Sequence, residues 1–554
     1  MAAEQWTAPA PPSQRSWVPL ALAVVMLLVA AAVLHQGRGT LPFYDEWNFI
    51  IERRGHSLST LLQPHNGHLV LAPLLLYKLL LQFAGLDHYW VFRLALVALH
   101  LLVGLGVFVL ARRRVGELGA LVAASLVLVC FAAADDLLWA FQISFLLAVA
   151  FGVWMLVGLD RESVRGDLLA CLCLAGTLAS AAIGLPFAVA AIVIIGLDSR
   201  RLQRAWVVVL PLLLFALWYL GYGVSELNPA NAPAAPRYAA EMASNAAGGL
   251  VGFGVEYGRP LVLALVAVLA LRFAKPRSVS PWLVAVVGTA VALWALTALA
   301  RADIGEPLAP RYIYPGAVLI VLIVVELLRG RRLAPAALPV AMLLVAVAAL
   351  ANYSTLGAFA AGLRANADVL SGRLGALAVV GAAVGPDFQP VPREDPVITV
   401  RGAARAQRDF GSIAVAAAAL PSASEPRRQA ADALLLAAGQ LKLAAAPAAT
   451  GRAPQLLALS GARSQAAGSC RRLLPVFAAA ISVDVALPPG SSLVVASADA
   501  VPLYVRRFAD SFPAEPSFTA AAGTPTRISA AADRSAVRWV VEAKPTAPLT
   551  VCAR

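Results

Sequence analysis

Apolar runs separated by short polar segments fill the chain from residue 17 to residue 351. Their lengths approach the ~20 residues that a helix needs to cross a bilayer. They predict about 11 membrane spans, at residues 17–34, 89–111, 116–134, 143–159, 167–181, 185–197, 205–222, 259–273, 281–299, 314–328 and 334–351.

Charge distribution decides two ambiguous runs. A span at residues 68–84 would place Arg112, Arg113 and Arg114 outside, so we interpret this run as a helix lying in the outer interface. The run 167–197 would extend about 46 Å as one helix, which exceeds the ~30 Å hydrocarbon core. Arginines flank it at both ends, so we expect two spans with a bend at residues 184–186.

Composition agrees with a polytopic α-helical membrane protein, because 60% of the residues are hydrophobic and only 14% are charged. A soluble domain has about 25% charged residues. Of the Lys and Arg residues up to residue 351, 15 fall in the predicted inner segments and 8 in the longer outer loops. Basic residues collect in cytoplasmic loops, so we interpret the net charge of +13 as a sign of membrane topology and not of nucleic-acid binding. We therefore expect a cytoplasmic leader at residues 1–16, the multi-span domain at 17–351 and a carboxyl terminus outside the membrane.

The composition changes after the last predicted span. Residues 352–469 are interpreted as a linker that is partly helical, at 429–443. From residue 470 to 554, short alternating segments separated by Gly and Pro predict an extracytoplasmic β-rich domain, with strands at 480–487, 492–496, 501–505 and 537–541 and the form of a β-sandwich. Cys470 and Cys552 bracket this segment and are expected to form a disulfide, with two unpaired thiols as the alternative.

The first outer loop, residues 35–88, contains five of the six histidines and the acidic pair Asp45-Glu46 beside Trp47. Asp45 follows the first span closely, so it is expected near the membrane surface, where a carboxylate can accept a proton from a hydroxyl group. The alternatives are a solvated loop acid or a helix cap.

Two histidines in this loop, His65 and His68, can share a face. They suit a metal ion, a phosphate or substrate contact, or simply a turn before the next helix. Other outer segments add polar candidates: Asp135, Asp136 and Gln142 in one short turn, and Arg301, Arg311 and Tyr312 around the tenth span. Arginine suits phosphate, with a headgroup anchor as the alternative, and tyrosine suits the membrane interface.

Motifs for soluble sugar or nucleotide donors, such as a Walker loop, a dinucleotide fingerprint or a zinc array, are absent from the sequence. The layout resembles the GT-C class of integral-membrane glycosyltransferases and its bacterial relatives. The resemblance covers roughly residues 1–351 and rests on Asp45-Glu46 after the first span, the interfacial helix from about residue 69, Asp135-Asp136 in the next outer turn and a soluble outer domain at the end.

That resemblance implies transfer of a hexose or pentose from a polyprenyl-phosphate donor to an envelope glycan, lipid or protein acceptor at the bacterial plasma membrane. It implies Asp45 as the catalytic base, and the expected substrate contacts are Glu46, Trp47, His65, His68, Asp135, Asp136, Gln142, Arg301, Arg311 and Tyr312. No cofactor is required, and a divalent cation is not indicated. The competing hypotheses are a polysaccharide polymerase or ligase, a lipid-linked glycan transporter, and a non-enzymatic scaffold that presents the carboxyl-terminal domain.

Overall fold

A computed structural model describes residues 17–275, 279–476 and 480–554, so the predicted leader at 1–16 lies outside the described residues. The chain forms two compact units. The first contains the described residues up to Arg38 together with Gly55–Leu80 and Trp90–Ala360, and the second contains Gly39–Arg54, Leu81–Tyr89 and Ala361–Arg554. Helices build the first unit, and the second unit contains helices followed by strands in its last part.

Within the described residues, seven helices are long and apolar enough to cross a membrane. These helices cover Val18–Gln36 (α1), Trp90–Leu128 (α4), Ala140–Leu159 (with α6), Gly254–Phe273 (α12), Pro281–Arg301 (α13), Pro310–Leu327 (with α14) and Pro335–Ala383 (with α15). Shorter apolar helices cover Leu71–Ala84 (α3), Ala182–Gly196 (with α8) and Trp206–Tyr222 (α10). Other helices cover Asn48–Glu52 (η1), Leu58–Leu62 (α2), Ala134–Leu138 (α5), Val164–Leu178 (α7), Arg201–Arg204 (α9) and Ala235–Val251 (α11).

Helix α4 contains two predicted spans, because it breaks at Gly116, whose φ is 77°. The two legs run antiparallel: a Cβ at Gly104 would lie 2.6 Å from the side chain of Leu128, and His100 Nε2 donates to the Leu128 carbonyl at 3.0 Å. A glycine suits this turn because only a residue without Cβ adopts such a backbone without strain.

The predicted bend near residue 184 is confirmed. Helix α7 ends at Leu178, a 3₁₀ turn covers Ala182–Gly184, and helix α8 begins at Leu185 with a proline in its first turn. Proline is tolerated there because the first turn of a helix needs no N–H donor at that position.

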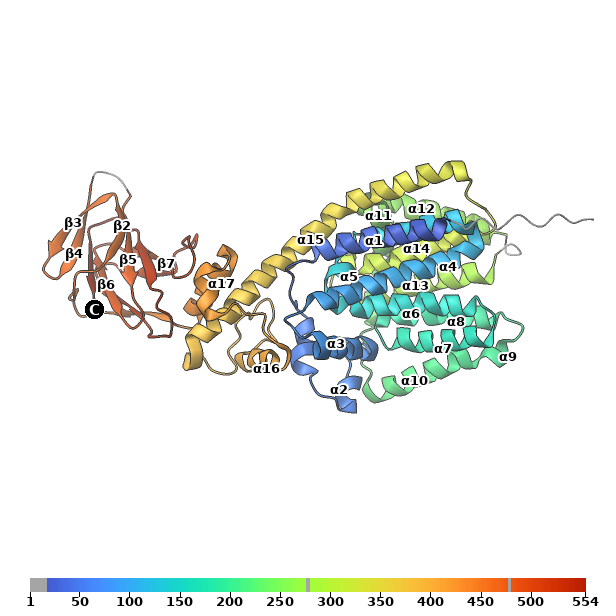
Figure 1. Ribbon diagram of the computed structural model, residues 1–554, viewed down its shortest axis with the longest axis horizontal. Helices are drawn as coiled ribbons and strands as arrows, with labels where there is room; N and C mark the ends of the chain where they lie inside the picture. Colours follow the sequence, from blue (N-terminus) through green and yellow to red (C-terminus); the bar gives the residue numbers. More distant parts are fainter. Residues whose placement is uncertain (1–16, 276–278, 477–479) are drawn as a thin grey trace, which may run out of the picture. The chain divides into compact units, whose positions relative to one another are not determined.

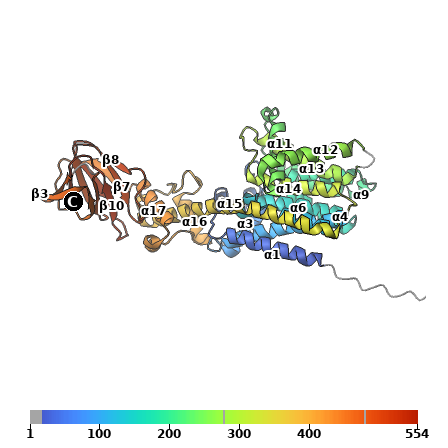
Figure 2. The same ribbon diagram turned by 90° about the horizontal axis from the view of Figure 1, so that it is seen from above.

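Helix α11 (Ala235–Val251) was not among the predicted elements, because polar residues interrupt its apolar pattern. Its packing is close: a Cβ at Gly258 of α12 would lie 1.8 Å from the carbonyl oxygen of Ser244. Figure 2 shows α11 and α12 on one side of the helical unit and α1 on the opposite side.

The helix that contains the last predicted span, residues 334–351, is longer than that span. Helix α15 (Leu338–Val380) continues without a break, because the alanine-rich sequence beyond the apolar run still favours a helix. The predicted bounds of the next helix are wrong. The predicted helix 429–443 is instead helix α17 (Glu425–Ala437), and its last predicted residues belong to strand β1. Helix α16 (Val400–Phe410) precedes it.

The described carboxyl-terminal residues form a six-stranded sheet of order β1-β9-β6-β11-β4-β3 and a five-stranded sheet of order β2-β5-β10-β7-β8. The strand bounds are Leu441–Ala445 (β1), Leu456–Ser460 (β2), Ala462–Ala467 (β3), Cys470–Pro475 (β4), Ser482–Leu487 (β5), Ser492–Ser497 (β6), Val501–Arg506 (β7), Phe518–Ala520 (β8), Thr526–Ala530 (β9), Trp539–Ala543 (β10) and Leu549–Ala553 (β11). The sheets therefore begin before the expected boundary at residue 470, because β1, β2 and β3 carry little of the apolar alternation that marks a strand.

Both sheets contribute to one hydrophobic core, in which Leu473, Leu493 and Leu549 of the first sheet pack with Val485 and Trp539 of the second. Cys470 and Cys552 form a disulfide between the neighbouring strands β4 and β11.

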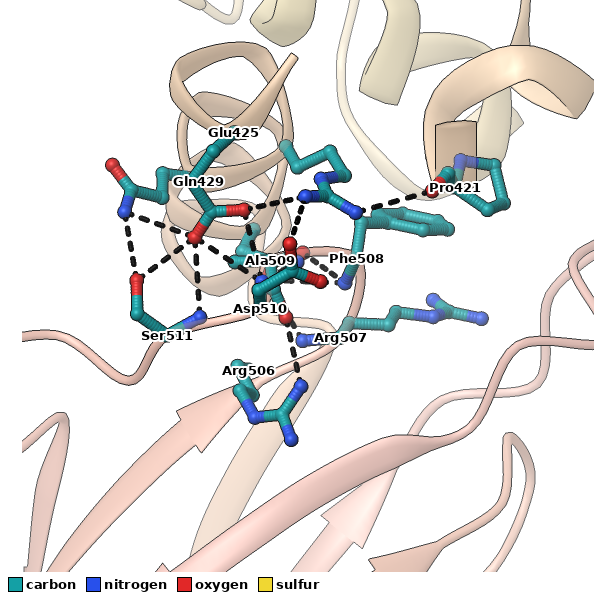
Figure 3. Close-up of polar contacts among 11 residues, drawn as sticks. Pro421, Glu425, Gln429, Arg506, Arg507, Phe508, Ala509, Asp510 and Ser511 are labelled. Carbon is teal, nitrogen blue, oxygen red and sulfur yellow. Dashed lines mark hydrogen bonds and ion pairs between the residues drawn. The ribbon is translucent and has the colours of Figure 1, made fainter. Parts of the chain in front are cut away.

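Acidic side chains of helix α17 accept hydrogen bonds from the loop after β7 (Figure 3). Glu425 accepts hydrogen bonds from Asp510 N (2.9 Å), Ser511 N (3.1 Å) and Ser511 Oγ (2.8 Å). Although burial acts in the opposite direction, these donors lower the pKa of Glu425 to about 2. Two turns further along, Asp432 accepts from the backbone N–H groups of residues 507–509.

Candidate functional site

The predicted site residues divide between the two units. His65, His68, Asp135, Asp136, Gln142, Arg301, Arg311 and Tyr312 belong to the first unit, and Asp45, Glu46 and Trp47 belong to the second.

The His65–His68 turn is tight, because each residue's N–H donates to the other's carbonyl, at 3.0 and 2.9 Å. Asn66 and Gly67 between them have φ of 47° and 71°, the left-handed region that favours these residue types. A Cβ at Gly67 would also lie 2.6 Å from the flexible side chain of Glu226, so Glu226 lies directly against this turn.

Glu226 connects this turn to the end of helix α13. Its Oε2 lies 3.7 Å from His68 Nε2, and it forms an ion pair with Arg301. Burial raises the pKa of Glu226, and Arg301 acts against that rise. Burial, together with the charges of Arg301 and His65, lowers the pKa of His68 to about 4. His68 is therefore neutral near pH 7.

The acidic pair lies on α5, and both side chains are buried. Burial raises the pKa of Asp135 to about 6, while the charge and the backbone N–H of Arg311 lower it. Burial and the charge of Asp135 raise the pKa of Asp136 well above its ordinary value. Apart from its own backbone N–H, the Asp136 carboxylate has no hydrogen-bond partner among the described residues.

Gln142 lies one short 3₁₀ turn after α5, and its buried Oε1 accepts no hydrogen bond from the part of the chain that the structure describes. The same 3₁₀ turn contacts His65, because the ring centroids of Phe141 and His65 are 5.2 Å apart. These contacts bring α5 and the His65–His68 turn together.

Arg311 precedes helix α14, and its guanidinium lies over the Tyr312 ring, 5.1 Å from the centroid, and 3.5 Å from Glu306. Tyr312 packs with Tyr238 of α11. Burial and Tyr312 raise the pKa of Tyr238, whereas the charges of Arg311 and Arg301 act against that rise, so both arginines lie near this tyrosine.

The structure thus gathers eight predicted residues with Glu226 and Tyr238, which sequence reasoning missed. We call this set the polar cluster: His65, His68, Asp135, Asp136, Gln142, Glu226, Tyr238, Arg301, Arg311 and Tyr312. Two guanidinium groups beside buried carboxyl groups can bind a phosphate and exchange a proton. Glu226 is the only acid between residues 199 and 240, which could have indicated it, but no sequence signal distinguishes Tyr238.

In the second unit, Glu46 and Trp47 are buried in the turn that contains Asp45. Glu46 Oε1 accepts from Phe43 N (3.1 Å), and both of its carboxylate oxygens accept from Tyr89 OH (2.8 and 2.7 Å). Trp47 Nε1 donates to the carbonyl of Pro42 at 3.3 Å. These contacts give both residues a structural role.

Asp45 itself is half-buried, and its electrostatic neighbour is Asp395, a second carboxylate that sequence reasoning missed. Burial raises the pKa of Asp395 to about 6; the Tyr44 N–H acts against the rise, whereas the charges of Glu394 and Asp45 add to it. No sequence signal links residues so far apart along the chain.

Groups of three or more His, Cys, Asp or Glu side chains that could hold a metal ion do not occur in the described ranges. Comparison with protein-family models, with curated proteins and with solved structures finds no match for this chain.

Proposed function

We propose that the protein is a membrane glycosyltransferase of the GT-C type, which moves a sugar from a polyprenyl-phosphate donor to an envelope glycan, lipid or protein acceptor on the outer face. The observation that carries the proposal is the polar cluster. Residues from four separate segments of the helical unit meet there, and they combine two arginines with buried acids.

The cluster has groups suited to the leaving phosphate. Arg301 and Arg311 supply fixed positive charge where the phosphate develops charge as the glycosidic bond breaks. Glu226 neutralises Arg301 in the absence of substrate, so phosphate binding would exchange one anion for another. His68 is neutral and acts as a hydrogen-bonding group.

A base must remove the proton of the acceptor hydroxyl. Asp45 takes this role in our proposal because its position after the first span resembles that of the catalytic acid in the GT-C class. The pKa of Asp135, about 6, adds a second candidate, because a general base works best when its pKa lies near the operating pH.

The architecture supports a chain with 11 spans. The seven long helices give 11 passages if the two legs of α4 are counted separately and α7, α8 and α10 are added. Two of the segments expected inside also meet, since Gly330 N donates to the Arg114 carbonyl at 2.9 Å. In this proposal the amino terminus is cytoplasmic, and the two sheets form an extracytoplasmic β-sandwich in the oxidising compartment that the disulfide suits.

The test is complementation of a deletion strain, read out by mass spectrometry of its envelope glycans. Wild-type protein should restore a sugar that the deletion strain lacks. Asp45→Asn should fail to restore it, and Arg311→Gln should reduce it at least tenfold, because the phosphate loses a charged partner. The matched control is Asp387→Asn, an acid whose side chain is 79% exposed.

Protein levels in the membrane, measured by immunoblot, separate loss of function from loss of folding. Restoration by Asp45→Asn with loss in Asp135→Asn would transfer the role of the base to Asp135. Full restoration by Arg311→Gln, Asp45→Asn and Asp135→Asn would overturn the proposed enzyme. Accumulation of a complete lipid-linked glycan would instead favour a polymerase, a ligase or a transporter.

A further inference from the structure

A cavity of about 480 Å³ opens between helices α4, α11, α12 and α14 of the helical unit, and the start of α15 closes one side. Pockets that bind small molecules have volumes of about 300–1,000 Å³. The lining is apolar apart from one end, where Arg331 and Arg332 follow helix α14. We call this cavity the apolar groove.

The length of the groove approaches the thickness of the hydrocarbon in one leaflet. It follows α14 from Ile320 to Leu328, which spans roughly 12 Å at the helical rise. Half of a hydrocarbon core measures about 15 Å. Leu261 of α12 and Val324 of α14, which line the groove, are 43% and 38% exposed, so its wall is accessible to a lipid chain.

Two arginines form the charged end of the groove. Arg331 and Arg332 are exposed, and neither forms an ion pair with any residue that the structure describes. The side chain of Arg332 lies against the break in α4, because a Cβ at Gly116 would be 3.6 Å from its Cγ. Two adjacent guanidinium groups beside an apolar channel complement a phosphate that is attached to hydrocarbon chains.

The groove is separate from the polar cluster. Arg311 precedes α14, whereas Arg331 follows it, so the two basic sites lie at opposite ends of a helix of 15 residues. A lipid whose phosphate binds Arg331 and Arg332 therefore belongs to the leaflet opposite the proposed donor. This position favours a bulk phospholipid of that leaflet over the polyprenyl-phosphate donor.

We propose that the apolar groove is a binding site for an anionic glycerophospholipid, with an acyl chain along α14 and the phosphate between Arg331 and Arg332. This site is independent of the glycosyltransferase activity proposed above. A bound acyl chain would fill the space that α4, α11, α12, α14 and the start of α15 line together.

The experiment is native mass spectrometry of the purified, delipidated full chain, titrated with phosphatidylglycerol or with phosphatidylcholine of the same acyl chains. Wild-type protein should retain phosphatidylglycerol preferentially. Arg331→Ala combined with Arg332→Ala should weaken phosphatidylglycerol binding about tenfold or more, because each surface arginine contributes to anionic-lipid affinity. The charge-matched control is Arg161→Ala with Arg165→Ala, two exposed arginines outside the groove.

A second pair of variants tests the hydrocarbon site. Val324→Trp fills the groove and should reduce retention of both lipids, whereas Val209→Trp, on an exposed face of α10, should not. Thermal unfolding in detergent checks that each variant is folded. Equal binding of the two lipids by wild-type protein, or unchanged binding by the double arginine variant, would overturn the proposal. Displacement of phosphatidylglycerol by a stoichiometric polyprenyl phosphate would do the same.

Discussion

Replacing Glu425 with Gln tests whether one carboxylate holds helix α17 to the loop after β7. The substitution keeps the size of the side chain and one acceptor oxygen. It removes the negative charge of the carboxylate, which accepts hydrogen bonds from residues 510 and 511 (Figure 3). We expect this change to loosen the contact without unfolding either element.

The magnitude follows from the pKa. A fall from the ordinary 4.5 to about 2 corresponds to roughly 3 kcal/mol at 1.36 kcal/mol per unit. The side chain is 30% exposed, so screening by solvent reduces the expected loss to about 2 kcal/mol. Because the folded-state pKa is lowered, this stabilisation is present above pH 4.5 and disappears as the pH falls toward about 2.

Hydrogen exchange followed by mass spectrometry of the purified full chain measures the effect locally. At pH 7 the amides of residues 510 and 511 should exchange about 30-fold faster in Glu425→Gln, since every 1.4 kcal/mol is a factor of ten. Glu515→Gln removes an equal charge from an exposed position and is the control. Unchanged exchange in Glu425→Gln, or equal acceleration in the control, would refute the reasoning.

Three further predictions follow from the other buried groups. Asp395→Asn should raise the melting temperature at pH 7.5 and have no effect below pH 4. The pKa of Asp395 in the folded chain is about 6, so its ionised form costs up to about 3 kcal/mol of stability above pH 6. Thermal scans at both pH values check this, and equal shifts of the melting temperature would contradict it. Cys470→Ser combined with Cys552→Ser should destabilise the β domain by about 4 kcal/mol, because the disulfide closes a loop of 82 residues. Proteolysis of that domain should become faster, and an unchanged rate would count against the prediction. The wild-type protein should lose stability as the pH falls from 6.5 to about 4, because His68 takes up a proton more readily in the unfolded chain than in the folded chain. His68→Gln should reduce this loss, and identical pH profiles of the melting temperature would exclude it.

The sequence by itself determined the class of protein and most of its helices. Apolar runs report burial in hydrocarbon directly, so helices α1, α6, α13 and α14 were predictable from their length and composition. The bend near Pro186 and the pairing of Cys470 with Cys552 were also predictable, because proline and cysteine act through local and covalent chemistry.

Only the tertiary structure decided which polar residues meet. Glu226 and Tyr238 are unremarkable in the sequence. Glu226 joins the polar cluster through its ion pair with Arg301 at the end of α13, and Tyr238 joins it because α11 packs against Tyr312. The pKa shifts of Asp135 and Asp395 also depend on burial, which no local pattern reveals. A hydrophobic pattern specifies that a face is buried, but the neighbours it is buried against follow from packing across the whole chain.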